Sequence, residues 1–172
     1  MNTCYLLLGT NLGDRRNNLL QTCSLLEVNA GRINKISGIY ETEPWGFSSD
    51  QWFYNMAMEL QTELTPENLL TILLQTEKMM GRERTEKDIY ENRIIDIDLL
   101  LFENQIIKTK TLEIPHPRLH LRKFALSPLV EIAPDIIHPV LKKKIKFLLD
   151  ECHDKSKISN IGHLQNIQPY SK

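Results

Sequence analysis

The first half of the chain alternates between short apolar runs and a longer amphipathic segment. Residues 3–9 are almost wholly apolar and end at a Gly-Thr-Asn turn, which is typical of a buried strand. In residues 14–31 apolar side chains recur every three or four positions and a glycine closes the segment, which predicts a helix. Residues 33–40 and 52–60 favour β-structure, and the stretch between them contains Pro and Gly, which predicts a loop that joins two strands.

A clearly marked helix and a strongly β-like strand follow. Thr65-Pro66-Glu67 predicts a helix start, because Thr caps, Pro is tolerated at the first helical position and Glu meets the positive end of the helix dipole. This helix should end near Gly81, and the polar residues 82–92 predict a loop. Residues 94–102 form a strand with two faces. One face carries Ile95, Ile97, Leu99 and Leu101, and the other carries Ile94, Asp96, Asp98, Leu100 and Phe102.

The last third of the chain predicts mainly helices. Residues 112–115 are extended, residues 124–132 and 141–151 have helical patterns, and residues from about 152 to 172 are expected to be a weakly ordered or peripheral extension. The order of elements predicts a single α+β domain over residues 1–172. It should contain a mostly antiparallel sheet with helices on one face and extra C-terminal helices.

Composition and charge exclude several classes of protein. The chain has 172 residues and a net charge of −1, so no global field would draw it to nucleic acid or to an anionic membrane. Its apolar runs are far shorter than the ~20 residues that a membrane span needs. The three cysteines lack CxxC spacing, and no basic segment precedes an apolar run at the start, so we expect a cytoplasmic protein with free thiols.

The sharpest chemical signal is Asp96-Ile97-Asp98 inside an apolar strand. Residues two apart in a strand point to one face and lie roughly 6.5 to 7 Å apart, so both carboxylates leave the same surface. Two like charges in apolar surroundings are costly unless something compensates them. Divalent cations such as Mg²⁺ do so through oxygen ligands and keep positions for water and phosphate. Pairing of the acids with Arg93 or a lysine is the alternative.

Basic residues stand before and after this strand. Arg82 and Arg84 begin the preceding loop and Arg93 ends it, and guanidinium groups match phosphate oxygens well. A solvated surface loop is the alternative, because acidic residues alternate with the basic ones. Further along, Pro115-His116-Pro117-Arg118 and Arg122 predict a cationic or hydrogen-bonding wall for an anion.

Aromatic side chains gather in the loop and strand around residues 44–55. Pro44-Trp45-Gly46-Phe47 precedes Trp52-Phe53-Tyr54-Asn55, and the Asn55 amide offers both a donor and an acceptor to a planar heterocycle. The rings suit stacking on a flat ligand, with Phe124 as a further apolar or stacking neighbour. A packed minicore that anchors the loop is the alternative. Neither GxxxxGK[ST] nor GxGxxG occurs, so a Walker loop or a dinucleotide fold has no support.

Taken in order, these clusters resemble the 6-hydroxymethyl-7,8-dihydropterin pyrophosphokinase family of the folate pathway. The resemblance covers about residues 3–150. It rests on Gly9-Thr10-Asn11-Leu12-Gly13, Tyr40-Glu41-Thr42-Glu43-Pro44-Trp45-Gly46, Phe53-Tyr54-Asn55, Glu77 with Gly81-Arg82, Arg93-Ile94-Ile95-Asp96-Ile97-Asp98-Leu99-Leu100, and Pro115-His116-Pro117-Arg118 with Arg122 and Phe124.

The resemblance implies a ferredoxin-like βαββαβ fold and transfer of the β,γ-diphosphate of the co-substrate ATP to the pterin hydroxymethyl group, with release of AMP. It implies two Mg²⁺ ions on Asp96 and Asp98, and these acids with Arg82 and Arg84 as catalytic residues. The implied ATP-binding residues are Arg82, Arg84, Arg93, Leu99, His116, Arg118 and Arg122. The implied pterin-binding residues are Thr42, Pro44, Trp45, Phe53, Asn55 and Phe124, and the closing-loop aromatic is Tyr90 in preference to Ile89.

We expect small molecules as the partners, with no nucleic acid and no membrane, and a monomer or weak homodimer. Two other functions stay open at this point. Another metal-dependent nucleotidyl- or phosphotransferase with a DxD motif would release pyrophosphate or ADP. A ferredoxin-like module that binds single-stranded nucleic acid would show steeply salt-dependent affinity, which the lack of net positive charge disfavours.

Overall fold

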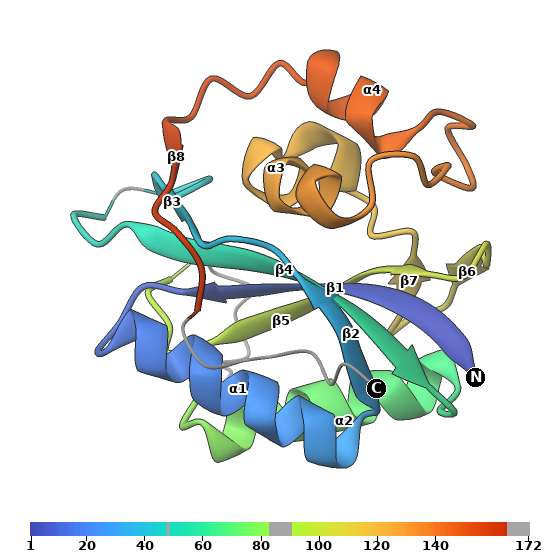
Figure 1. The fold of residues 1–172 in the computed structure, drawn as a ribbon, viewed down its shortest axis with the longest axis horizontal. Coiled ribbons are helices and arrows are strands. Elements are labelled where there is room, and N and C mark those ends of the chain that lie inside the picture. The colour runs from blue at the N-terminus through green and yellow to red at the C-terminus, as the bar shows by residue number, and fades with distance from the viewer. Residues whose placement is uncertain (48, 83–90, 165–172) are drawn as a thin grey trace.

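A six-stranded sheet forms the middle layer of the protein (Figure 1). The computed structural model describes residues 1–47, 49–82 and 91–164. The strands run in the order β5-β1-β4-β3-β8, β2 also pairs with β4, and every pair is antiparallel. The mostly antiparallel α+β sheet predicted from the sequence is therefore observed. The strands are β1 (Asn2–Thr10), β2 (Arg32–Ile36), β3 (Tyr40–Thr42), β4 (Phe53–Thr62), β5 (Asp96–Phe102) and β8 (Ile158–Asn160).

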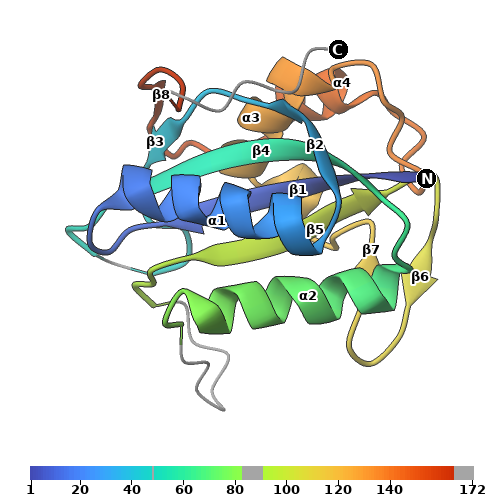
Figure 2. The same cartoon turned by 60° about the horizontal axis from the view of Figure 1, so that its bottom comes forward.

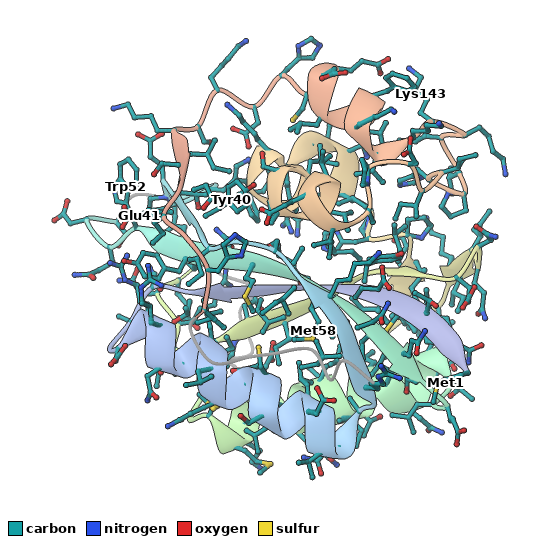
Figure 3. All side chains as sticks on the ribbon, viewed as in Figure 1. Met1, Tyr40, Glu41, Trp52, Met58 and Lys143 are labelled. Carbon is teal, nitrogen blue, oxygen red and sulfur yellow. The ribbon has the colours of Figure 1, made fainter. Side chains whose placement is uncertain are left out.

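Helices α1 (Arg15–Asn29) and α2 (Pro66–Met79) cover one face of the sheet (Figure 2). Both begin at a capping residue: Asp14 Oδ1 accepts from the Asn17 N–H at 3.0 Å, and Thr65 Oγ1 accepts from the Asn68 N–H at 3.3 Å. The core on this side includes Met58, which points from the sheet towards the helices (Figure 3).

Helix α3 (Lys123–Ile132) covers the opposite face, and α4 (Ile145–Asp150) lies against α3 on its outer side (Figure 1). Leu7 and Ala57 of the sheet belong to the same buried cluster as Leu126 and Leu129 of α3. The prediction of helices on one face is thus correct for α1 and α2, whereas the extra C-terminal helices form a third layer.

The polypeptide between β5 and α3 contains three short elements, of which only β7 lies in a stretch, residues 112–115, that was predicted to be extended. Strands β6 (Ile107–Lys108) and β7 (Glu113–Ile114) pair with each other, and a 3₁₀ turn (Leu119–Leu121) precedes α3. Helix α4 is shorter than the predicted 141–151, because an isolated bridge between Ile137 and Lys144 closes a turn before it.

Strand β5 contains a bulge that changes the predicted alternation. Asp98 pairs with Leu7 of β1, but the register shifts between Leu6 and Tyr5, so that Leu101 pairs with Tyr5. The shift leaves one extra residue on β5. Leu101 consequently joins the α3-side core and Phe102 joins the α1/α2-side core, the reverse of the faces that strict alternation predicts for them.

The chain after α4 contributes an edge strand and a core residue. The sequence predicts a weakly ordered or peripheral extension from about residue 152. In the structure β8 pairs antiparallel with β3 at the periphery of the sheet, and Leu164 belongs to the buried core. Residues 165–172 lie outside the described ranges. Among the helices of the described ranges, none has the length and apolar character that crossing a membrane would require.

Candidate active site

A pocket opens on the α3 side of the sheet, near the carboxyl end of β1. Four neighbouring strands supply its floor, with Asp96 and Asp98 from β5, Gly9 from β1, Asn55 from β4 and Thr42 from β3. Gly9 pairs with Asp96 on one side and with Asn55 on the other. A Cβ atom at position 9 would lie 3.0 Å from Asn55 Oδ1, so the glycine keeps the middle of the floor open.

Most of the site residues predicted from the sequence line this one pocket. Leu99 does not, because its side chain is buried in the core on the α1/α2 side, and Pro44 is not among the lining residues either. Arg84 and Tyr90 fall outside the described residues. Among the described residues, the lining consists of Leu7, Gly9, Thr42, Glu43, Trp45, Phe47, Phe53, Asn55, Arg82, Arg93, Asp96, Asp98, His116, Arg118, Arg122 and Phe124.

Guanidinium groups from three segments contact the two carboxylates. Arg93 Nη1 lies 3.4 Å from Asp96 Oδ2, and Arg82 Nη1 contacts Asp96 Oδ1. Arg122 Nη1 lies 3.4 Å from Asp98 Oδ2. The predicted projection of both acids from one face is confirmed, because both line the pocket. The arginines compensate the acidic charge in this structure, and they meet at the place where an anionic ligand would enter.

The side chain of Glu77 connects the loop that follows α2 with β5, the strand that carries the two acids. Its side chain is 2% exposed, and Oε1 accepts from Arg82 Nη1 at 2.7 Å and from the Ile97 N–H at 2.8 Å. Glu77 belongs to the motif series that carries the family resemblance, but it was not among the predicted site residues. A signal was present, because Glu77 continues the helical apolar stripe of Leu69 and Leu73, where a carboxylate needs a buried partner.

Burial and neighbouring charges shift two pKa values in opposite directions. Burial, together with the charge of Asp96, raises the pKa of Asp98 to about 7, although Arg122 and Arg93 act against this rise. Burial and the charges of Arg122 and Arg118 lower the pKa of His116 to about 4. His116 is therefore neutral near pH 7. Its Nδ1 accepts from the Arg118 N–H at 3.2 Å, which places the ring proton on Nε2, 3.5 Å from Arg122 Nη1.

Aromatic rings line the part of the pocket nearest β3 and the start of α3. The Trp45 and Phe124 rings lie 6.2 Å apart, and Phe47 meets Phe53 edge-on at 6.1 Å. Arg122 lies over the Trp45 ring at 4.9 Å and so links the rings to the charged part of the pocket. Phe47, one of the rings of the aromatic cluster in the sequence, lines the pocket, and so does Glu43, which was not predicted as a site residue.

Polar groups stand beside these rings. The side chain of Asn55 is buried, and its Nδ2 donates to Thr42 Oγ1 at 2.8 Å. This bond orients the Asn55 amide, whose Oδ1 lies on the side of Gly9 and the pocket floor. The combination of rings with an oriented amide is suited to a flat ligand that carries hydrogen-bonding edges.

The two carboxylates also fit a hard divalent cation. Asp96 and Asp98 supply oxygen ligands, and the described residues contain no group of three or more His, Cys, Asp or Glu side chains that would enclose a metal. A cation held by two carboxylates would take its other ligands from water or from a bound phosphate, which is the usual chemistry of Mg²⁺. The raised pKa of Asp98 points the same way, because a nearby cation would relieve the repulsion between the acids.

Comparison with known proteins gives a consistent set of relatives. Residues 5–134 match the family described as 7,8-dihydro-6-hydroxymethylpterin-pyrophosphokinase. The 2-amino-4-hydroxy-6-hydroxymethyldihydropteridine pyrophosphokinase of Aquifex aeolicus is 42% identical over 146 residues, covering 85% of this chain and 89% of the relative. The Bacillus subtilis protein of the same name is 41% identical, covering 78% of this chain and 80% of the relative.

Solved structures give the same fold at lower identity. The crystal structure of wild-type Plasmodium falciparum HPPK-DHPS with pteroate superposes with a TM-score of 0.69 at 20% identity, covering 87% of this chain and 42% of that chain. A triple mutant of the same protein gives a TM-score of 0.70 at 19% identity. The present chain spans less than half the length of these solved chains, and the likeness supports the fold.

Proposed function

Because this chain belongs to the 7,8-dihydro-6-hydroxymethylpterin-pyrophosphokinase family, we propose that it transfers the β,γ-diphosphate of ATP to the hydroxymethyl group of 6-hydroxymethyl-7,8-dihydropterin. AMP is the second product, and the reaction belongs to folate biosynthesis. The observation that carries this proposal is the junction of an acid pair ringed by guanidinium groups with an aromatic compartment in one pocket.

The triphosphate occupies the charged part of the pocket. Arg82, Arg93, Arg118 and Arg122 surround it, and neutral His116 accepts or donates a hydrogen bond without adding charge. Phosphoryl transfer needs positioning and charge neutralisation more than it needs a protein nucleophile, so an arginine cluster is suited to the task.

Asp96 and Asp98 would hold two Mg²⁺ ions. When bound, these ions supply charge neutralisation to the phosphates and lower the cost of deprotonating the acceptor hydroxyl. Arg82 and Arg93 contact Asp96 in this structure, and they would be available to phosphate oxygens if the carboxylates held the ions instead. Glu77 would continue to hold Arg82.

The pterin occupies the aromatic part of the pocket. Phe53 and Phe124 enclose the ring, Trp45 packs beside Phe124, and the Asn55 amide, oriented by Thr42, reads the ring edge. A pterin bound in this way would direct its hydroxymethyl group towards the acid pair on the other side of Gly9. Roles for Arg84 and Tyr90 in a closing loop remain predictions, because both lie outside the described residues.

The remaining features agree with a compact catalytic unit. The strand order β5-β1-β4 with β2 and β3 beyond β4 supports a ferredoxin-like arrangement, to which α3, α4 and β8 are additions. We propose that residues 1–172 act as one catalytic domain in the cytoplasm. The cysteines are consistent with a reducing compartment, since Cys4, Cys23 and Cys152 are all free thiols.

The test is an assay of the full chain with ATP, Mg²⁺ and 6-hydroxymethyl-7,8-dihydropterin, in which the nucleotide products are separated and counted. We expect one AMP for each pterin diphosphate, with no AMP when the pterin or the metal is omitted. Release of ADP or of pyrophosphate would identify a different transferase, and absence of turnover would contradict the proposal.

A further inference from the structure

The segment that follows α4 reaches both walls of the aromatic part of the pocket. We call residues 152–164 the C-terminal strap. It leaves α4, passes the start of α3 and then runs along β3 (Figure 1). The family match ends at residue 134, so the strap lies beyond the region that the family match covers.

The first contact of the strap is with the wall formed by β3. Strand β3 has only three residues, and β8 provides its outer neighbour, with Thr42 opposite Ile158 and Tyr40 opposite Asn160. The other neighbour of β3 is β4, which carries Phe53 and Asn55. Without β8, the strand that carries Thr42 would be an exposed edge of three residues.

Glu43, which lines the pocket, continues this contact. Its N–H donates to the Lys157 carbonyl at 3.3 Å, and its Oε2 accepts from the Lys157 N–H at 2.9 Å. The Lys157 ammonium lies 3.7 Å from Glu43 Oε1. Backbone and side chain of Glu43 are thus both held at the point where the chain turns from β3 towards Trp45.

The second contact is with the wall formed by the start of α3. The Lys123 N–H, the first of the helix, donates to Asp154 Oδ2 at 3.1 Å. Arg122, the residue before the helix, has no side chain that accepts a hydrogen bond, so Asp154 serves as the acceptor for this helix end. Lys123 stands between Arg122 and Phe124, which both line the pocket.

The far end of the strap is fixed as well. Arg16 of α1 donates from Nη2 to the Ile161 carbonyl at 2.9 Å, and Ile39 exchanges backbone hydrogen bonds with Ile161 and Gly162. Tyr40, labelled in Figure 3, donates to Glu131 Oε2 of α3 at 2.9 Å and ties the two walls directly. Hydrogen bonds therefore hold the strap at the start of α3 and again beyond β8.

We propose that the C-terminal strap is a positioning element for the pterin. It sets the separation between the β3 wall, which carries Thr42 and Glu43, and the α3 wall, which carries Phe124. This inference rests on the proposed function, because it assigns the aromatic compartment to the pterin. Lys157 acts through the pocket residue Glu43. Asp154 and Ser159 act through Lys123 and Glu41, which are next in the chain to pocket residues.

Two substitutions loosen the two contacts separately. Asp154→Ala removes the acceptor at the start of α3, and Asp154→Asn keeps an oxygen there. The bonds at Ile39/Ile161 and Glu43/Lys157 place the intervening pair Glu41/Ser159 at a hydrogen-bonded position of the antiparallel ladder. Ser159→Pro therefore removes a ladder donor, whereas Ser159→Ala leaves the backbone unchanged.

The experiment measures kcat and the KM of each substrate for the full chain, together with pterin and ATP-analogue dissociation constants by calorimetry. For Asp154→Ala and Ser159→Pro we expect the pterin KM and dissociation constant to rise about five- to tenfold, as for one lost hydrogen bond. The ATP values should stay within about twofold by the same reasoning. Asp154→Asn, Ser159→Ala and the distant exposed control Asp135→Ala should resemble the wild type.

The remaining outcomes overturn the inference, the proposed function on which it rests, or both. Unchanged pterin binding would show that the strap does not position the ring. Equal weakening of pterin and ATP, with a lower Tm, would show a purely structural role. A wild-type protein that produces no AMP would reject the proposed function instead, and a wild-type protein that binds no pterin in calorimetry would reject both.

Discussion

The charged and aromatic parts of the pocket are held together by different forces. On the charged side, Asp96 and Asp98 are balanced by guanidinium groups from three separate segments, and the contacts are ion pairs between side chains. On the aromatic side, Asn55 and Thr42 sit on paired strands and the rings pack on one another. Ligand binding must rearrange the first part, whereas the second is a preformed slot.

This difference predicts where catalysis and where binding will fail. Interactions that are exchanged when the ligand enters are able to strengthen in the transition state, and their loss lowers kcat. A preformed binding slot stabilises the bound substrate and the transition state equally, so the loss of a side chain from the slot raises KM.

The largest effect is expected from the acid pair. Asp96→Ala and Asp98→Ala should each lower kcat at least about a hundredfold, because the metal charge that stabilises the transition state is lost. The fold should persist or become more stable, since repulsion between the acids is relieved. Steady-state kinetics and a thermal melt measure both quantities, with Asp135→Ala as the exposed control. Near-normal turnover would refute the metal role.

Removal of the metal should reproduce this effect in the unaltered chain. A chelator should abolish AMP formation, and added Mg²⁺ should restore it, because the acids alone cannot neutralise the phosphates. Turnover that persists in excess chelator would separate the acid pair from metal binding.

A somewhat smaller effect is expected from Arg82. Arg82→Ala should lower kcat by about ten- to a hundredfold and change the affinity for an ATP analogue much less, because Arg82 reaches phosphate only after it leaves Asp96. Arg118→Ala serves as a comparison, since Arg118 also lines the pocket and lies 5.8 Å from the Trp45 ring. Equal losses of binding with unchanged kcat would contradict a transition-state role for Arg82.

The aromatic side should respond through binding. Phe124→Ala should raise the pterin KM about tenfold, since it removes a stacking surface and the partner of Trp45, and should leave the ATP KM within about twofold. The isosteric change Phe124→Tyr, which keeps the ring, is the control. A loss confined to kcat would show that Phe124 contributes to the transition state and not to pterin binding.

The smallest effect is a pH dependence of stability, in which two buried groups oppose each other. The pKa of Asp98 is about 7 in the folded protein and 3.8 as the ordinary value, so between these values the folded state holds the extra proton and stability falls as pH rises. The pKa of His116 is about 4 against an ordinary 6.5, so the unfolded state holds the extra proton and stability rises over that window.

Thermal melts from pH 4 to pH 7 separate the two contributions. In Asp98→Asn the Tm should rise by a few degrees relative to the wild type across this range, and in His116→Asn it should fall by a similar amount. Parallel curves for all three proteins would show that neither group carries a shifted pKa.

Much of the charged side could be predicted from sequence, because local rules determine it. The two-residue period of a strand places Asp96 and Asp98 on one face, and the capping signal at Thr65 marks the start of α2. Leu99 shows the limit of such reasoning. Its assignment to the nucleotide came from the resemblance, whereas the alternation that exposes the acids directs the Leu99 side chain into the core.

The remaining features depend on contacts between distant segments. Strand β8 is three residues long and largely polar, so its sequence has no recognisable strand pattern. It forms because it pairs with the edge of β3. The placement of α3 over the second face similarly depends on Leu7 and Ala57, which look like ordinary strand residues in the sequence.

The bulge in β5 gives that strand two functions along its length. Before the bulge, the alternation of side chains directs the carboxylates towards the pocket and the aliphatic side chains into the core. After the bulge, the alternation is shifted by one residue, and apolar side chains are buried on both faces of the strand. Deleting one residue at the bulge would restore a regular ladder, but either the carboxylates or the buried apolar side chains would then point to the wrong face. Insertions and deletions in this strand should therefore be tolerated far less than substitutions.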